Sequence, residues 1–570
     1  MLKYIQKFKT LFLLTLQSVF VFLYIRNDPD PFHSGFVYSQ SVAVSDGLLP
    51  NRNFLSPYGA IGPLLNGVWL QLVDNSLLSL LMFYGLITIS SGFIMQRIVS
   101  GIANPATGII LNLVWVFMLA TAMPWPSILT TFLTLSAVAV LLNNLPRIIT
   151  ASHKRHIYVI PSVLAFQLAA LTRIHLVITP LIITMIFIWK RKSINPYFFR
   201  TWFVAQAAVA TILLTVLYLL AILEPFIEQV IVWPLTSFEN PKIDISFIFS
   251  FVWFPISLVV MAFLVLFAME TQRVNARRHL RYLVVITVLA YFYFIYFFSV
   301  YSSPAGETNT LKSVPGLIKT ASVNLQFMPS YAAATLAIFL LIQFCLRLFR
   351  SSQNSMDDRK ILEYGLMLSL CITGWVQLYP LHDNVHLWFI TPLLVIPAIF
   401  FLKESLPNFS TYLKPLVVVL SCFLSIQLLS LYSFLSIDRV PLNSKELNGM
   451  AASVDFRDTT DQTMILLNKH VTKRNLRNNC VASLFSVSDR SYRSIDGNFS
   501  ANFFGLFVQN TPIVDPVKNL PELVFECDID TNRKQQLLEL GLEVVFEVKH
   551  VSRDTSKGFR FNALFRNTSS

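Results

Sequence analysis

Two aspartates follow directly on the first apolar segment of the chain. Asp28 and Asp30 flank a proline, and His33 comes three residues after Asp30. Proline fixes its own backbone φ angle, so the stretch is stiff and the directions of both carboxylates are restricted. A carboxylate that is partly withdrawn from water has a raised pKa, which suits it to act as a general base. The same pair could instead hold a divalent cation, or simply be solvated at the end of a helix.

Two further groups of residues could bind an anion. Arg52 and Tyr58 follow in the same loop, and Arg173 and His175 stand between two short apolar segments. An arginine near hydrocarbon is costly unless it is paired, and a guanidinium binds a phosphate through two parallel hydrogen bonds. The two arginines could therefore hold the phosphate of a lipid-linked substrate. The alternative is that each reaches for the headgroups of ordinary lipids.

A third candidate group lies late in the chain. Asp383 and His386 are three residues apart, so they share one face if this stretch is helical. His382 could bind a metal together with His386, although two histidines alone are a weak signal. The alternative is a capping aspartate and an interfacial histidine.

Composition indicates that a membrane protein carries these groups. Of the 570 residues, 54% are apolar and only 13% are charged, and the mean hydropathy is +0.59. A soluble globular protein has about 25% charged residues. Apolar runs of about 17–25 residues, the length that spans a bilayer, recur between residues 11 and 436. The net charge of +13 does not predict nucleic-acid binding, because no basic stripe is interleaved with surface aromatic residues.

The apolar runs predict an α-helical polytopic membrane protein with about 13 transmembrane helices. The runs lie at about 9–25, 77–96, 107–122, 127–145, 157–172, 174–190, 201–222, 247–269, 283–300, 329–346, 361–377, 387–402 and 415–436. No small-residue cleavage site follows the first run, which favours an uncleaved helix over a signal peptide.

The basic residues predict which side of the membrane each loop faces. With the N-terminus in the cytoplasm, about 21 lysines and arginines of the membrane region fall on the cytoplasmic side and 6 on the other. The first outer loop is then 26–76, and the outer side also holds the Met-Pro-Trp-Pro stretch at 123–126, Arg173, the 378–386 loop and the C-terminal region. Helical spacing predicts interfacial helices at 35–45 and 60–73 within the first loop.

The chain divides into a transmembrane domain at 1–437 and a small extracytoplasmic α/β domain at 438–570. Charges are dense in the second part and its apolar runs are short. Its pattern predicts helices at 458–475 and 531–540, and strands at 481–487, 523–527, 542–548 and 558–565. No catalytic motif stands out in it. Cys480 and Cys527 could form a disulfide if this region is extracytoplasmic, although spacing alone does not establish the pair.

The first outer loop resembles that of the C-type (GT-C) integral-membrane glycosyltransferases, which use polyprenyl-phosphate-linked sugars on the outer face of the membrane. In many bacterial relatives the loop reads roughly Asp-Pro-His-His-Asp-Gly, then Arg-Asp-Phe, then Gln-Tyr-Gly. The residues that match here are Asp30, His33, Gly35, Arg52, Phe54, Tyr58 and Gly59. Ser34 replaces the second acid and Asn53 replaces the aspartate after the arginine. These departures leave open which carboxylate is the base and whether a metal is held.

A second stretch carries the same resemblance. Residues 379–388 look like the late outer loop of such enzymes, in which an aspartate and a histidine three residues apart precede the last core helices. Asp383 and His386 are the corresponding pair. The convincing part of the resemblance covers about residues 10–75, and within the superfamily it points to bacterial relatives similar to dolichyl-phosphate-mannose-protein mannosyltransferases.

The resemblance implies a hexosyl- or pentosyltransferase in a bacterial inner membrane. It would transfer a sugar from a polyprenyl phosphate to a glycan, lipid or protein acceptor on the extracytoplasmic face. Asp30, or else Asp28, would be the catalytic base, and both could hold a divalent cation. The substrate-binding residues would be His33, Arg52, Tyr58, Arg173, His175, Asp383 and His386. No nucleotide cofactor is expected, because the chain has no Walker or Gly-rich phosphate loop.

Two other functions fit a chain with many helices and polar outer loops. A transporter or flippase of lipid-linked glycans usually has internal repeats and ionisable residues or broken helices at mid-bilayer, whereas the ionisable residues here gather at one face. A polymerase or ligase of such glycans would be expected to carry its key residues in large later loops, whereas here the first loop is the richest.

Overall fold

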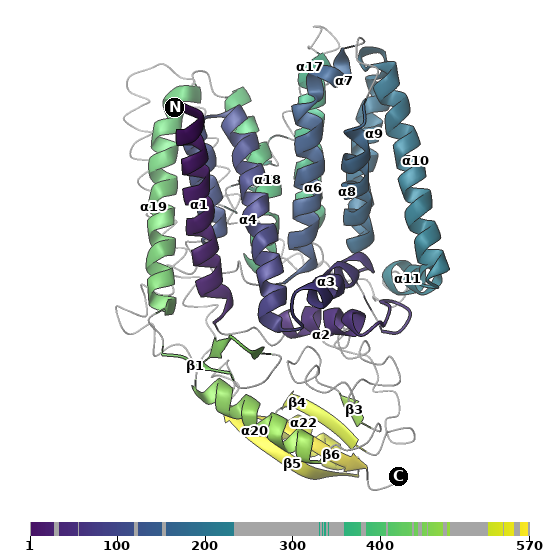
Figure 1. Ribbon diagram of the computed structural model, residues 1–570, viewed down its shortest axis with the longest axis vertical. Coiled ribbons are helices and arrows are strands. Elements are labelled where there is room, and N and C mark those ends of the chain that lie inside the picture. Colours follow the sequence, from purple (N-terminus) through teal and green to yellow (C-terminus); the bar gives the residue numbers. More distant parts are fainter. Residues whose placement is uncertain are drawn as a thin grey trace.

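The computed structural model of the protein is mostly helical, with a small sheet near the C-terminus (Figure 1). It describes residues 2–27, 33–54, 56, 58–118, 124–150, 156–232, a few positions between 330 and 340, 358–377, 384–405, 409–435, 438–442, 447–452, 454–470, 476–478, 523–529, 531–539, 541–551 and 559–567. The predicted runs at 247–269 and 283–300, and almost all of the run at 329–346, lie outside these residues.

The other ten predicted apolar runs each coincide with a helix. The helices are α1 (Leu2–Ile25), α4 (Leu77–Ile102), α5 (Pro105–Val116), α6 (Pro126–Asn143), α8 (Val159–Thr172), α9 (Ile178–Trp189), α10 (Pro196–Leu219), α17 (Asp358–Gln377), α18 (Asn384–Ser405) and α19 (Phe409–Leu435). Among the described residues, four helices are long and apolar enough to cross a membrane, namely α4, α6, α10 and the part of α18 from His386. The helical class is therefore confirmed, while the number of 13 spans stays a prediction.

The starts of several helices follow from residues that satisfy the first free backbone N–H groups. The Asn104 side chain accepts a hydrogen bond from the Thr107 amide at 2.8 Å, and Pro105 opens α5. The same pair of residue types opens α10, where the Asn195 side chain accepts from the Tyr197 amide at 2.9 Å. Proline at the first helical position loses no hydrogen bond, because that N–H has no partner within the helix.

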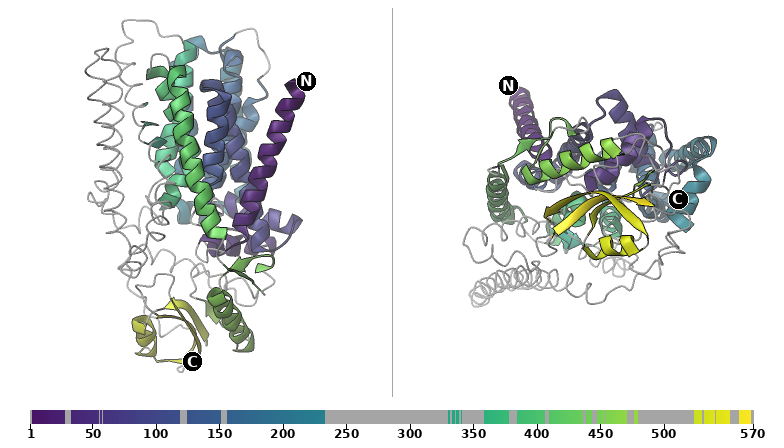
Figure 2. Two further views of the ribbon diagram at one scale, coloured as in Figure 1. Left: turned by 90° about the vertical axis from the view of Figure 1, so that its left-hand side faces the viewer. Right: turned by 90° about the horizontal axis from the view of Figure 1, so that it is seen from below.

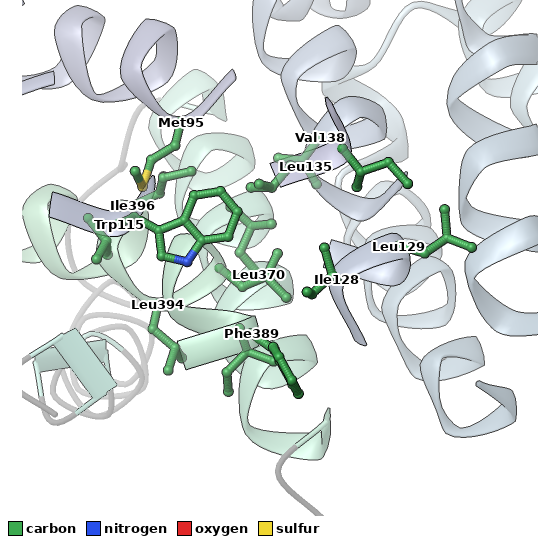
Figure 3. Close-up of a cluster of buried hydrophobic side chains, with 14 of the residues drawn as sticks. Met95, Trp115, Ile128, Leu129, Leu135, Val138, Leu370, Phe389, Leu394 and Ile396 are labelled. Atoms are coloured by element: carbon green, nitrogen blue, oxygen red, sulfur yellow. The ribbon is translucent and has the colours of Figure 1, made fainter. Parts of the chain in front are cut away.

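A buried core joins α4, α5, α6, α17 and α18, although α5 and α18 are far apart in the sequence (Figure 3). Trp115 of α5 stacks on Trp388 of α18 with ring centroids 5.6 Å apart. Each indole N–H donates to the backbone carbonyl of the other tryptophan, at 3.1 and 3.2 Å. Both rings are thus buried with their polar group satisfied, which fixes the register of the two helices.

Polar side chains also connect three helices inside the bundle. The Gln17 amide of α1 donates to Asn112 of α5 at 3.0 Å, and Asn112 donates to Gln96 of α4 at 2.8 Å. Gln17 and Asn112 are fully buried. Such interhelical hydrogen bonds hold helices together where lipid gives no hydrophobic drive for association.

Two helices of the first predicted outer loop lie across one end of the bundle, close to the short helix α11 (Leu223–Ile227) (Figure 1). They are α2 (His33–Ser45) and α3 (Ile61–Leu72), and they confirm the helices predicted at 35–45 and 60–73. Gly67 lets them pack closely, since a Cβ there would lie 2.4 Å from Val44. We refer to this end of the bundle as the α2–α3 end.

The opposite end of the bundle carries the N-terminus, the short helices α7 (Leu145–Ile149) and η2 (Arg191–Ser193), and an ion pair. Lys190, directly after α9, donates to Asp358 of α17 at 3.0 Å, and the Ser193 hydroxyl donates to the same carboxylate at 2.5 Å. These contacts tie α9 to α17 at the end where the sequence predicts cytoplasmic loops.

Replacing Asp358 with asparagine should lower the free energy of unfolding by about 0.5–1 kcal/mol at neutral pH, since the pair is partly exposed. The hydrogen bonds from Ser193 and then Lys190 lower the pKa of Asp358. A lowered pKa adds stability above the ordinary pKa of aspartate, and this is lost as the pH falls through the lowered pKa. The unfolding temperatures of the wild type and Asp358→Asn in detergent should therefore differ at pH 7 and converge in acid. Glu363→Gln, which removes a pair within α17 to the exposed Arg359, is the control with the smaller expected effect. A difference that persists in acid would contradict the role of the ion pair.

The C-terminal part contains a four-stranded sheet of order β3-β4-β6-β5 (Figure 2). The strands are β3 (Leu476–Asn478), β4 (Leu523–Ile529), β5 (Leu542–Val551) and β6 (Phe559–Asn567), and the helices α20 (Val454–His470) and α22 (Thr531–Glu539) accompany them. The predicted strands at 523–527, 542–548 and 558–565 and the helix at 531–540 are present. The predicted helix at 458–475 begins four residues earlier, and the short strand β3 was not predicted. The predicted strand at 481–487 and Cys480 lie outside the described residues, so the disulfide stays a prediction.

Candidate functional site

Several of the predicted site residues lie where the structure gives no side-chain description. Asp28, Asp30 and Asp383 lie outside the described residues. The backbone of His33 begins α2, but its side chain is not described. The described part of the candidate site consists of Tyr58, Arg173, His386 and the residues around them.

Arg173 is the charged group at the centre of the candidate site. It follows the last residue of α8, in the turn before the short 3-10 helix η1 (Ile174–Val177), and only 4% of it is exposed. Its Nη1 donates to the Ser127 hydroxyl at the start of α6 and, at 3.3 Å, to the backbone carbonyl of Gln377 at the end of α17. Three helix ends thus meet at one guanidinium.

The ring of Tyr58 lies beside this guanidinium. The central carbon of the Arg173 guanidinium is 5.7 Å from the ring centroid, a distance at which the aromatic quadrupole attracts a cation. Burial raises the pKa of Tyr58 to about 12 despite the opposing effect of Arg173, so the phenol is neutral at pH 7. Burial lowers the pKa of Arg173 to about 10, partly offset by Tyr58, so the arginine remains charged at pH 7. The site therefore presents a positive charge beside a neutral hydroxyl.

Aromatic rings extend from Tyr58 into the bundle. Trp125 lies edge-on to Tyr58 with centroids 5.3 Å apart, and Phe36 of α2 lies 6.3 Å from both rings. Trp125 also contacts the ring of His386, in the first turn of α18, at 6.0 Å. Trp125 and His386 are both buried. We call Phe36, Tyr58, Trp125, Arg173 and His386 the arginine–aromatic cluster.

The loop before α3 places Tyr58 by a close approach of its backbone to α8. Gly59 has a φ of +119°, and a Cβ on it would lie 2.2 Å from the carbonyl oxygen of Leu171. The Ser56 hydroxyl closes the turn by donating to the Gly59 carbonyl at 2.6 Å. Only glycine fits at this position, because both the backbone angle and the space exclude a side chain. Tyr58 is thereby held next to the end of α8, where Arg173 begins the turn.

A second set of hydrogen bonds anchors the same loop. Asn51, with φ of 62°, donates to the Ser56 carbonyl and to the Gln229 side chain, both at 2.9 Å. Gln229 in turn donates to the Asn51 carbonyl at 2.8 Å. Asn53, which stands where relatives of the resembled family carry an aspartate, accepts from the Leu49 amide at 2.8 Å. Asn53 thus stabilises the turn in this structure.

Arg52 lies apart from the arginine–aromatic cluster, whereas His175 lies close enough to Arg173 to interact with its charge. Arg52 is exposed and donates to the Leu220 carbonyl at the end of α10, at 3.2 Å. His175 lies in η1, two residues after Arg173, and its Nε2 has no hydrogen-bond partner among the residues that the structure describes. The structure therefore brings together Tyr58, Arg173 and His386, while Arg52 faces outward on the same end.

Sequence reasoning missed three residues that support Arg173. Ser127 and the Gln377 carbonyl accept its hydrogen bonds, and Thr130 donates to the Gln377 side chain at 2.8 Å. Gln377 is only 1% exposed. A signal was available: Gln377 is a polar residue at the end of an apolar run, directly before a predicted outer loop. Ser127 likewise directly follows Pro-Trp-Pro in another predicted outer loop, at 123–126.

A metal site is not assembled by the described residues. In that part of the chain no group of three or more His, Cys, Asp or Glu side chains could hold a metal ion. Asp28 and Asp30 lie outside that part of the chain, so the predicted cation between them stays a prediction.

Replacing Gly59 with alanine should destabilise the protein and displace Tyr58 from Arg173. The new methyl group meets the Leu171 carbonyl, and the left-handed backbone adds strain of about 1–2 kcal/mol. Gly47→Ala is a matched control, because Gly47 also has positive φ but nothing within 4 Å of its Cβ position. We expect the unfolding temperature to fall clearly more for Gly59→Ala than for the control. Equal losses would mean that strain alone, and not the close approach to α8, matters at Gly59.

Comparison with protein-family models, with curated proteins and with solved structures found no match for this chain.

Proposed function

We propose that the protein is an integral-membrane glycosyltransferase that takes a sugar from a polyprenyl phosphate on the extracytoplasmic face of a bacterial inner membrane. The observation that carries this proposal is the arginine–aromatic cluster. Its members come from four predicted outer segments of the chain, and all of them meet at the α2–α3 end. That convergence is what a site for a substrate at one membrane face requires. The topology of 13 spans, with the N-terminus in the cytoplasm, belongs to the same proposal.

Arg173 would hold the phosphate of the donor. A polyprenyl-phosphate sugar enters laterally from the bilayer, so its phosphate arrives at the depth of the helix ends, where Arg173 lies. Charge-assisted hydrogen bonds from a guanidinium stabilise the phosphate both in the donor and as the leaving group. Ser127 and Gln377 hold Nη1 in place, so little reorganisation is needed when the negative charge develops.

The aromatic members of the cluster would bind the sugar and exclude water. Sugar rings present C–H faces that pack on aromatic side chains, and the neutral hydroxyl of Tyr58 can donate or accept a hydrogen bond. His386 lies beside Trp125 and comes three residues after Asp383 in the sequence. His33 and Asp383 are assigned to substrate binding from the sequence, and so are His175 and the exposed Arg52.

Asp30, or else Asp28, would act as the general base. The acceptor hydroxyl oxygen forms a bond to the anomeric carbon of the sugar as its proton passes to the carboxylate. The bond between the anomeric carbon and the phosphate oxygen breaks, and polyprenyl phosphate leaves with that electron pair. A phosphate is a good leaving group once its charge is balanced, so the step needs no general acid. These steps use no nucleotide, and the acceptor is a glycan, a lipid or a protein.

The proposal is tested by comparing lipid-linked sugars and surface glycans in cells with and without the intact gene. We expect one polyprenyl-phosphate sugar to accumulate on the outer leaflet when the gene is lost, which would name the donor. Accumulation on the inner leaflet alone would indicate a flippase. Unchanged lipid-linked sugars together with unchanged glycans would contradict both functions.

A further inference from the structure

A segment late in the chain, described at 438–442 and 447–452, contacts the end of α1 through Ala451. We call these two described pieces the strap. The Ala451 amide donates to the Arg26 carbonyl at 2.7 Å, and Asn27 forms an isolated parallel β-bridge with Ala451. Figure 1 places the strap at the lower end of α1, before α20. The backbone of Arg26 and Asn27 is thus paired with a segment more than 400 residues later in the chain.

The strap has its own folded structure. Its strands β1 (Val440–Pro441) and β2 (Ala451–Ala452) pair antiparallel, and the Leu442 amide donates to the Met450 carbonyl at 3.0 Å. Gly449 has φ of +80°, and a Cβ there would lie 2.8 Å from the Leu78 side chain at the start of α4. The turn of the strap therefore rests on α4 while its second strand reaches the end of α1.

Apolar side chains of the strap are buried in the main core of the bundle. Leu442, Leu447, Met450 and Ala452 are each 5% exposed or less, and they belong to the same buried cluster as Ile25 of α1 and Leu77 of α4. Burying such side chains contributes on the order of 1.5–3 kcal/mol each for the larger ones. Packing against the bundle thus holds the strap in place, and its Ala451 amide anchors the Arg26 carbonyl.

We propose that the strap is a positioning element for the catalytic loop. Asp28 directly follows Asn27, and consecutive Cα atoms are about 3.8 Å apart, so fixing Asn27 restricts where Asp28 and then Asp30 begin. α20 begins two residues after the strap and packs against β5. The strap thereby couples the C-terminal sheet to the loop, an inference that rests on the proposed transferase function.

Ala451→Pro tests the inference, because proline lacks the N–H that binds the Arg26 carbonyl. Ala451→Ser is the matched control, since it keeps that N–H at the same position. The first readout is hydrogen exchange of the segment around residues 26–33 in the full-length protein in detergent. The second is transfer from a labelled polyprenyl-phosphate sugar, with kcat and the KM for the donor measured separately.

For Ala451→Pro we expect faster exchange around residues 26–33 and at least a 10-fold lower kcat, with the donor KM within about 2-fold of the wild type. Ala451→Ser should match the wild type in both readouts. Unchanged exchange in Ala451→Pro would overturn the anchoring, and faster exchange with unchanged kcat would overturn the positioning role. If Ala451→Pro does not accumulate, Gly449→Ala disturbs the strap at Leu78 and takes its place with the same expected results. A wild type without transfer activity would refute the proposed function, whereas the exchange experiment would still decide the anchoring.

Discussion

Replacing Arg173 with glutamine should reduce sugar transfer at least about 100-fold while the protein still folds. Glutamine can keep a hydrogen bond to Ser127 or to the Gln377 carbonyl, but it carries no charge for the phosphate. Loss of one donor that stabilises developing charge typically lowers kcat by about 100- to 1,000-fold. The measurement is the rate of polyprenyl phosphate release by the purified variant, with thermal unfolding as the check on folding.

Arg147→Gln is the matched control for the loss of a charge. Arg147 is exposed at the opposite end of the bundle, where its guanidinium donates to the Asn144 side chain at 3.4 Å. Its variant should keep transfer within about 2-fold of the wild type. Surface substitutions away from a functional site usually change only the stability, and only by a small amount. Equal activities of the two variants would mean that Arg173 serves only to join α6, α8 and α17.

Replacing Asp30 with asparagine should have the larger effect on turnover. A positioned general base contributes about 100- to 10,000-fold, and asparagine has nearly the shape of aspartate but does not accept the proton. The donor KM should change little, because the carboxylate acts on the acceptor hydroxyl. The measurement is kcat and donor KM under saturating acceptor, together with expression and unfolding temperature.

Asp28→Asn is the comparison that assigns the base. If Asp30 takes the proton, the Asp28 variant keeps much more of the activity than the Asp30 variant. The reverse order would move the role to Asp28, and near-normal turnover in both would remove the acidic stretch from the mechanism. Ser34, which stands where the resembled family carries a second acid, is buried in the first turn of α2. A carboxylate at that position would lose its hydration, which is costly unless the charge is paired.

The helices were predictable from the sequence because their signals are local. Apolar length marks ten of them, and Asn-Pro pairs at 104–105 and 195–196 mark where two begin. The two helices across the α2–α3 end could be predicted because helical spacing resumes after the acidic stretch. The lengths were less predictable: α5 ends at Val116, several residues before the apolar run does.

The candidate site was predictable in its residue types but not in its contacts. Arg173 stood out because a charge in an apolar region requires a partner. Its partners Ser127 and Gln377 were not identified. They lie 46 and 204 positions from Arg173 in the sequence, so their hydrogen bonds depend on how the helices pack. The separation of Arg52 from the cluster also depends on packing. No local pattern indicated that the Arg52 side chain points to the end of α10.

The most direct test of the proposed function uses the purified full-length protein in lipid nanodiscs with a panel of labelled polyprenyl-phosphate sugars. The wild type is expected to release polyprenyl phosphate from one member of the panel and to pass its sugar to an acceptor. Arg147→Gln should do the same, and Arg173→Gln and Asp30→Asn should not. Consumption of no donor by the wild type, or equal consumption by all four proteins, would contradict the assignment of a polyprenyl-phosphate-dependent transferase with its site at the α2–α3 end.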